Sequence, residues 1–230
     1  MKWPGVFTMI GLFLALGGPV VLTGHWGGIS GRKNSSTNDQ IALWAILALV
    51  IAIIIFGEGR SLDSIGLHFP TWGTLLWGIT AAAFIEVTGA IVFPFLTRTG
   101  IVDYSKKIAV LEEWPLWLIL FAVLTAGVVE EALYRGYAIE RFRWMSGSYW
   151  WAAAISLVIF GLVHLPFWGR GALVWSFFAG GVFTVLYLWK HDLLACMLAH
   201  TICDLKALLI DPFVRRHRKH PARESAVQLS

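Results

Sequence analysis

Residues 115–139, PLWLILFAVLTAGVVEEALYRGYAI, combine the length of a membrane span with a cluster of charged side chains. The first part of this stretch, residues 115–129, carries no charged side chain, and Glu130, Glu131 and Arg135 then follow closely. The stretch is long enough to cross a bilayer, whose hydrocarbon core takes ~17–25 helical residues. A charged side chain at mid-bilayer costs roughly 2.5–3.5 kcal/mol on insertion scales, so such residues are expected to line a site or a water-filled cavity.

The rest of the chain has the same apolar character. Of its 230 residues 57% are hydrophobic and only 14% are charged, whereas soluble domains carry about a quarter charged residues. We count seven apolar segments, and helices are expected because backbone groups in lipid must satisfy their own hydrogen bonds. The sequence therefore predicts an all-α, polytopic membrane bundle with one integral membrane domain over residues 1–230. The segments cover approximately residues 6–23, 41–57, 74–96, 115–139, 149–167, 171–189 and 192–210.

The connecting segments bear on span number and orientation. Residues 97–114 are expected to lie on the membrane surface as a short amphipathic helix, or to form an eighth span if they enter it. Lys and Arg residues gather in loops and in a basic polar tail, residues 211–230. They indicate topology and lipid-headgroup contacts in a multi-pass protein of the cell membrane, and nucleic acid is not expected as a partner. With seven spans the positive-inside rule places the C-terminus in the cytoplasm, and an eighth span would change that parity.

Within residues 115–139, the adjacent acids Glu130 and Glu131 are expected to have different roles. Glu131 and Arg135 are four residues apart with the acid first, the favourable order for an ion pair on one helix face. Glu130 lies about 100° around the helix and is left free to act. Ala126 and Gly127, one turn earlier, are expected to leave room for a substrate or water beside it. The alternative is a structural ion-pair network that clamps helices together.

Two later segments add ionisable residues to this pair. Phe160-x-x-x-His164 places a ring one turn before an imidazole that it can orient, although a lone histidine in a membrane helix more often forms an interhelical hydrogen bond. His200-x-x-x-Asp204 puts two polar groups on one face. The aspartate can hold the imidazole tautomer, help to bind a metal, or donate to a developing oxyanion if protonated. Together these residue types form a hydrolytic set.

Two questions about this set stay open at the level of sequence. Glu130, His164 and His200 could form a zinc site with an open position, or Glu130 and His164 could activate a water without metal. Glu86, in the segment 74–96, could pair with Arg135 or line the same cavity.

The order of the three motifs resembles the CPBP family, the CAAX protease and bacteriocin-processing family, also called Abi. Residues 125–210 carry the resemblance, and 115–210 would be the catalytic core. The resemblance implies that Glu130 and His164 activate the attacking water, while His200 and Asp204 bind the oxyanion or share in metal binding. Glu131, Arg135 and Phe160 would support them. The CAAX endopeptidase branch of this family usually has Asn where Asp204 stands here.

These observations favour an intramembrane endopeptidase, with or without a catalytic metal, that acts on a membrane-associated protein or peptide. One alternative is a proton-coupled transporter that uses the same acids and histidines as a relay, but the internal repeat typical of transporters is not found. Another is a non-catalytic member of the CPBP family with an immunity or scaffold role.

Overall fold

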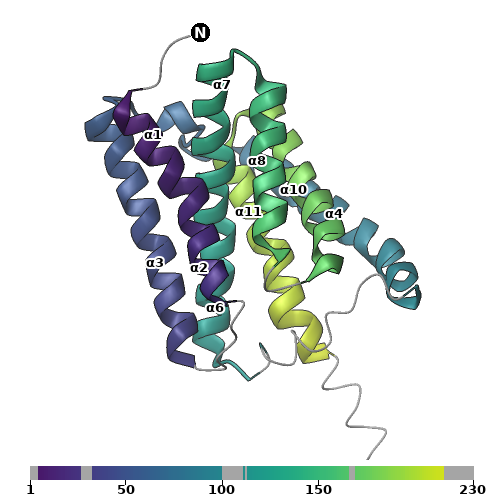
Figure 1. The fold of residues 1–230 in the computed structure, drawn as a ribbon. Coiled ribbons are helices and arrows are strands. Elements are labelled where there is room, and N and C mark those ends of the chain that lie inside the picture. Colours follow the sequence, from purple (N-terminus) through teal and green to yellow (C-terminus); the bar gives the residue numbers. More distant parts are fainter. Residues whose placement is uncertain (1–4, 27–32, 100–110, 112, 166–168, 215–230) are drawn as a thin grey trace, which may run out of the picture.

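The computed structural model describes residues 5–26, 33–99, 111, 113–165 and 169–214. All regular elements in this part of the chain are helices that pack into a bundle (Figure 1), so the predicted all-α class is confirmed. Five of them are long and apolar enough to cross a membrane, which makes the chain an integral multi-pass membrane protein. They are Thr37–Gly57, Trp72–Arg98, Leu116–Ser146, Leu173–Lys190 and Leu193–Val214.

The predicted count of seven spans is not confirmed. Two of the predicted segments form shorter apolar helices, Val6–Leu22 and Tyr149–Val163. A helix rises 1.5 Å per residue, so the second of these covers only about 22 Å of a hydrocarbon core roughly 30 Å thick. Most of the region of the predicted eighth span, residues 100–110 and 112, lies outside the described residues. So does most of the predicted polar tail, residues 215–230.

One rod runs through the middle of the bundle and is its most buried span. It consists of α6 (Leu116–Leu124), η4 (Thr125–Ile139) and α7 (Glu140–Ser146). Half of the residues in the most apolar part of this span are buried, compared with 22–39% in the other four spans. The η4 part is π-helical, with the wider i→i+5 hydrogen bonding that often occurs at functional sites. The charged residues of the 115–139 stretch therefore lie in the core of the protein.

The remaining helices surround this rod on two sides (Figure 1). On one side lie the N-terminal helices and a helix that continues into a short π-helical turn. On the other side lie the helices that follow the rod in sequence, with one earlier helix leaning away from the bundle. The first group is α1 (Val6–Leu12), η1 (Phe13–Gly17), α2 (Gly18–Trp26), α3 (Lys33–Ala52) and η2 (Ile53–Gly57), and the second is α8 (Tyr149–Val163), α10 (Arg170–Lys190), α11 (Leu193–Leu205), η5 (Lys206–Ile210) and α4 (Trp72–Arg98).

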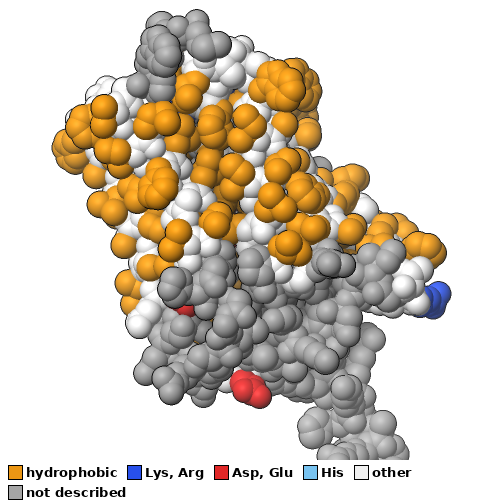
Figure 2. Space-filling view, viewed as in Figure 1, with side chains coloured by type: hydrophobic (Ala, Val, Ile, Leu, Met, Phe, Trp, Pro, Cys, Tyr) orange, Lys and Arg blue, Asp and Glu red, His pale blue; other side chains and the backbone are white. Residues whose placement is uncertain are grey.

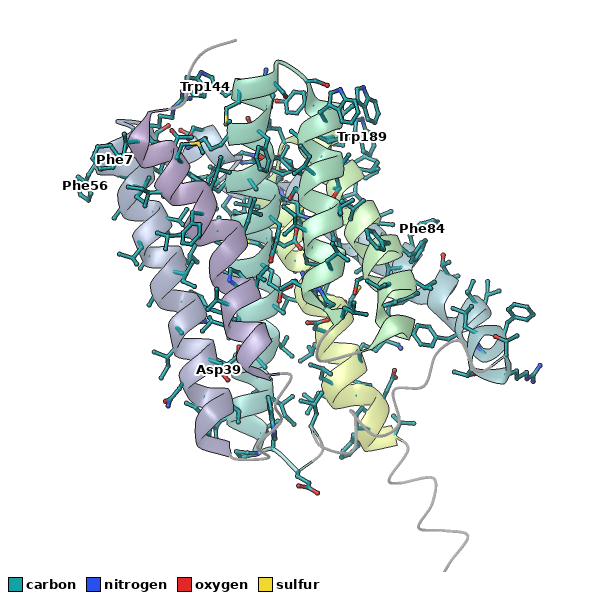
Figure 3. All side chains as sticks on the ribbon, viewed as in Figure 1. Phe7, Asp39, Phe56, Phe84, Trp144 and Trp189 are labelled. Atoms are coloured by element: carbon teal, nitrogen blue, oxygen red, sulfur yellow. The ribbon has the colours of Figure 1, made fainter. Side chains whose placement is uncertain are left out.

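The outer surface is apolar, as expected for helices in lipid. In Figure 2 hydrophobic side chains cover most of the described part of the visible face. Phe7, Phe56 and Phe84 point away from the bundle in Figure 3, and Phe56 is 84% exposed. So continuous an apolar surface is unfavourable for a monomer in water, whereas contact with lipid tails suits it.

A buried polar cluster ties the first helices to the rod. Glu58 accepts hydrogen bonds from Thr8 Oγ1 and the Tyr137 hydroxyl, both at 2.9 Å, on one carboxylate oxygen. Its other oxygen accepts a hydrogen bond from Arg141 Nε at 2.9 Å. Both carboxylate oxygens of Glu58 are therefore satisfied, and we assign this cluster a structural role.

The start of α11 is held in place by hydrogen bonds, which fixes the position of the histidine two turns later. Asp192 caps the helix by accepting from the Ala195 N–H at 3.0 Å, and it also accepts from Thr74 Oγ1 of α4 at 2.6 Å. The Leu193 N–H donates to the Gly66 carbonyl at 2.9 Å. This close approach requires glycine, because Gly66 has φ +72° and a Cβ there would lie 2.8 Å from the His191 carbonyl oxygen.

The loop residue His191 gives the fold a pH dependence. Its Nε2 lies 3.1 Å from Glu140 Oε1, which also accepts from the Tyr187 hydroxyl, and Arg143 is 3.7 Å from the other oxygen. The hydrogen bond with Glu140 raises the pKa of His191 above the ordinary 6.5. A raised pKa in the folded state means that the interaction stabilises the fold below pH 6.5 and is lost as the pH rises through the raised value.

We therefore expect His191→Asn to lower the melting temperature in detergent at acidic pH and to change it little at alkaline pH. Asn suits the left-handed backbone of this position, where φ is 51°, and it does not titrate. The effect is expected to be under about 1 kcal/mol, since the pair is partly exposed. Thermal unfolding of both proteins across a pH series measures it, and a difference that widens toward alkaline pH would contradict the assignment.

Candidate active site

Three helices bring the predicted site residues together. Glu130 and Glu131 come from η4, His164 follows the last residue of α8, and His200 and Asp204 come from α11. Each acid lies within 3.8 Å of a histidine nitrogen. The predicted convergence of the three motifs is thus present in the structure.

The innermost part of the site is an ion pair without access to solvent. Arg135 Nη1 donates to Glu131 Oε1 at 2.8 Å, and the two side chains are 1% and 0% exposed. The same oxygen accepts from His200 Nδ1 at 2.8 Å. The predicted Glu131–Arg135 pair forms, and Glu131 also links the rod to α11.

Arg135 is held in a cradle made largely by α10. Its Nη2 donates to the Gly180 carbonyl at 3.1 Å. Its guanidinium lies over the ring of Phe160, 4.0 Å from the centroid, and 5.6 Å from that of Phe183. The ring of Phe183 in turn stacks on His200, with centroids 4.9 Å apart and planes at 25°.

Gly180 and Phe183 were not found by sequence reasoning, because α10 carries no motif of ionisable residues. The only signal was the adjacent pair Gly180-Gly181 inside an apolar segment, since small residues are typical of close helix contacts in membranes.

The outer part of the site is the pair Glu130 and His164. Their side chains are 22% and 19% exposed, in contrast to the buried inner pair, and Glu130 Oε2 lies 3.8 Å from His164 Nε2. His164 Nδ1 donates to the Phe160 carbonyl at 2.7 Å. In a neutral imidazole this leaves the lone pair on Nε2, directed toward Glu130. Phe160 therefore orients His164, through its backbone as well as its ring, whose centroid is 4.7 Å from that of the imidazole.

His200 lies between two carboxylates. Its Nδ1 donates to Glu131, and its Nε2 lies 3.7 Å from Asp204 Oδ2. Asp204 is the more accessible of the two acids, with 29% of its side chain exposed. Because both ring nitrogens face carboxylate oxygens, each is placed to carry a hydrogen.

Two expectations about neighbouring residues are corrected. Gly127 does not open space beside Glu130; it allows close packing of α11, because a Cβ there would collide with the side chain of Thr201. Of the two roles considered for Glu86, pairing with Arg135 is not found, because Arg135 pairs with Glu131 and Gly180. Instead, Glu86 Oε2 lies 2.9 Å from Lys206 Nζ, which also contacts Asp211 at 3.0 Å. That Glu86 lines the cavity stays a prediction.

The arrangement of the acidic and histidine side chains also bears on whether the site could bind a metal. In the described part of the chain, no group of three or more His, Cys, Asp or Glu side chains is arranged to hold a metal ion. The zinc alternative built on Glu130, His164 and His200 therefore finds no support in the geometry, and no step below is routed through a metal.

The segment that carries these residues also carries a family match. Residues 112–206 match the family model described as type II CAAX prenyl endopeptidase Rce1-like. The resemblance to the CPBP family is thereby confirmed, over a segment that covers less than half of the chain and includes all three motifs. At the level of the Rce1-like family, the match supports an intramembrane endopeptidase. No match was found among curated proteins or among solved structures.

The cradle of Arg135 gives a direct test of the geometry of this Rce1-like segment. A Cβ at Gly180 would lie 2.9 Å from Arg135 Nη2 and 2.8 Å from the Phe160 ring, whereas a Cβ at Gly181 would meet nothing within 4 Å. We expect Gly180→Ala to cost about 1–3 kcal/mol of stability through overpacking, and to displace Arg135. Gly181→Ala should be neutral or slightly stabilising, since Ala favours helix.

Thermal unfolding of the two variants in detergent measures this difference. The two substitutions are chemically identical and adjacent in one helix, so the detergent and the helix propensity affect both alike. Equal melting temperatures for the two variants would contradict the close packing of Gly180 on Arg135.

Proposed function

We propose that the chain is an intramembrane endopeptidase that hydrolyses a peptide bond in a membrane-associated protein or peptide. The observation that supports this best is the arrangement of Glu130 and His164. Their facing atoms are 3.8 Å apart, too far for a direct hydrogen bond, and both side chains are partly accessible.

A separation of this size suits a water molecule held between the two groups. His164 Nε2 and Glu130 Oε2 are both acceptors, so they can take the two hydrogens of one water. As Glu130 removes a proton, the oxygen of the water forms a bond to the carbonyl carbon of the substrate. The proton on Glu130 then passes to the leaving amine when the C–N bond breaks.

His200 is placed to stabilise the charge that develops on the carbonyl oxygen. Glu131 is paired with Arg135, so it acts as a carboxylate and accepts from His200 Nδ1. Asp204 favours a hydrogen on Nε2, which can donate to the oxyanion. Asp204 itself can donate there if it is protonated. Glu131 and Arg135 thus act through His200 and do not meet the substrate.

The substrate is best described by its location. The site lies among helices whose outer surfaces are apolar, and the matched family is described by its action on CAAX prenyl proteins. Asp204 stands where the CAAX endopeptidases usually carry Asn, so we propose a membrane-associated protein or peptide, and we treat a prenyl group on it as an experimental question.

Replacing Glu130 by Gln should abolish cleavage, because an amide cannot take the proton of the water. General-base residues contribute roughly 10²–10⁴-fold to rate, so the loss should be of that order. Protein termini are compared by mass spectrometry in membranes from cells that express the wild type, Glu130→Gln or Glu86→Gln. The last variant is a matched control, since Glu86 is also a glutamate in a membrane-spanning helix, but its ion-pair partner is Lys206 and not a histidine of the site.

The expected result is a set of termini present with the wild type and Glu86→Gln and absent with Glu130→Gln at equal protein level. If Glu130→Gln produces the same termini, the proposal is wrong. Inspection of the new termini for prenylated C-terminal segments decides the substrate class. Cleavage that stops with a zinc chelator and returns with added zinc would contradict the metal-free step.

A further inference from the structure

Three buried polar atoms of η4 have no hydrogen-bond partner among the described residues: Glu130 Oε2, Glu131 Oε2 and the Tyr134 hydroxyl. Such atoms are rare in folded proteins, and each one destabilises the fold unless water or a ligand satisfies it. Tyr134 needs an explanation above all, because its side chain is 0% exposed and a phenylalanine would fill the same space without a polar atom.

The surroundings of Tyr134 fix its ring beside the outer part of the site. Its ring meets that of Phe160 edge-on, with centroids 5.2 Å apart, and its carbonyl accepts from Ser156 Oγ at 2.7 Å. It follows Glu130 by four residues, a spacing that places both side chains on the same side of the rod. Tyr134 and His164 therefore both contact Phe160, and Tyr134 is on the same side of the rod as Glu130.

The hydrogen-bond balance of the site shows what the hydroxyl can do. A buried water typically makes about three hydrogen bonds. Glu130 and His164 supply two acceptors and no donor, so they hold the hydrogens of the water but leave both lone pairs of its oxygen undirected. A tyrosine hydroxyl is a donor, and it is the group that this water lacks.

We propose that Tyr134 is a positioning residue, whose hydroxyl donates a hydrogen bond to the water held between Glu130 and His164. This inference rests on the proposed function. With one lone pair held by Tyr134, the remaining lone pair has a single direction, toward the substrate carbonyl. This water is then a hydrogen-bond partner for both the Tyr134 hydroxyl and Glu130 Oε2, which have none among the described residues.

The test compares two tyrosines of the same rod. Tyr134→Phe and Tyr137→Phe each remove one oxygen from a fully buried ring, but the Tyr137 hydroxyl donates to Glu58 in the structural cluster. The substrate is a quenched-fluorescence peptide that spans a cleavage site found with the Glu130→Gln comparison. Turnover number, KM and melting temperature are measured in detergent for both variants and the wild type.

We expect Tyr134→Phe to lower kcat on the order of tenfold, as for loss of one hydrogen bond to the reacting group, with unchanged KM and an unchanged or higher melting temperature. Tyr137→Phe should show the opposite pattern, with a lower melting temperature and a kcat close to the wild type. If Tyr134 only packed in the core, its kcat would not change.

The outcomes separate this inference from the proposal on which it rests. If Tyr134→Phe has wild-type kcat while Glu130→Gln is inactive, Tyr134 does not position the water and the endopeptidase proposal stands. If Glu130→Gln is active, the endopeptidase proposal itself fails. If Tyr134→Phe does not accumulate, a fluorinated tyrosine at position 134 keeps the ring and makes the hydroxyl more acidic. An unchanged pH profile of kcat for that protein would overturn the inference.

Discussion

The buried ion pair of Glu131 and Arg135 fixes the positions of most of the other polar groups in the site. Two charges out of contact with water are costly unless further hydrogen bonds satisfy them. Here His200, the Gly180 carbonyl and the Phe160 ring supply those contacts, each from a different helix. Loss of one partner of such a pair typically costs about 3–5 kcal/mol, so the arrangement of α8, α10 and α11 around the rod depends on it.

This pair also accounts for the two parts of the site. Glu131 has its Oε1 occupied by Arg135 and His200, and its side chain is 0% exposed, so a substrate does not reach it. Glu130, the residue before it, projects in a different direction from the rod, and its side chain is partly exposed. Two adjacent acids can therefore serve different purposes: one anchors the fold and orients His200, and the other faces His164.

Sequence reasoning predicted contacts within the candidate site well wherever the relevant spacing lies within one helix. The Glu131–Arg135 pair and the shared face of His200 and Asp204 follow from helical periodicity alone. It failed where a contact depends on how helices pack together: Phe183 on His200, Gly127 against Thr201, and Glu86 with Lys206. It also placed the start of α3 at residue 41, because hydropathy marks where apolar residues begin, whereas the helix begins at Lys33.

A purely structural network would explain the inner residues but not the outer ones. Groups that clamp helices together are found at direct hydrogen-bond distance, as Glu131 is from both Arg135 and His200 at 2.8 Å. Glu130 and Asp204 instead stay 3.8 Å and 3.7 Å from the histidine nitrogens that they face, and both remain partly exposed. If these two pairs served only to stabilise the fold, direct hydrogen bonds would stabilise it more than these longer separations do. Each gap is of a size that an oxygen atom can bridge, from a water at Glu130 and from a substrate at Asp204, which favours chemistry over clamping.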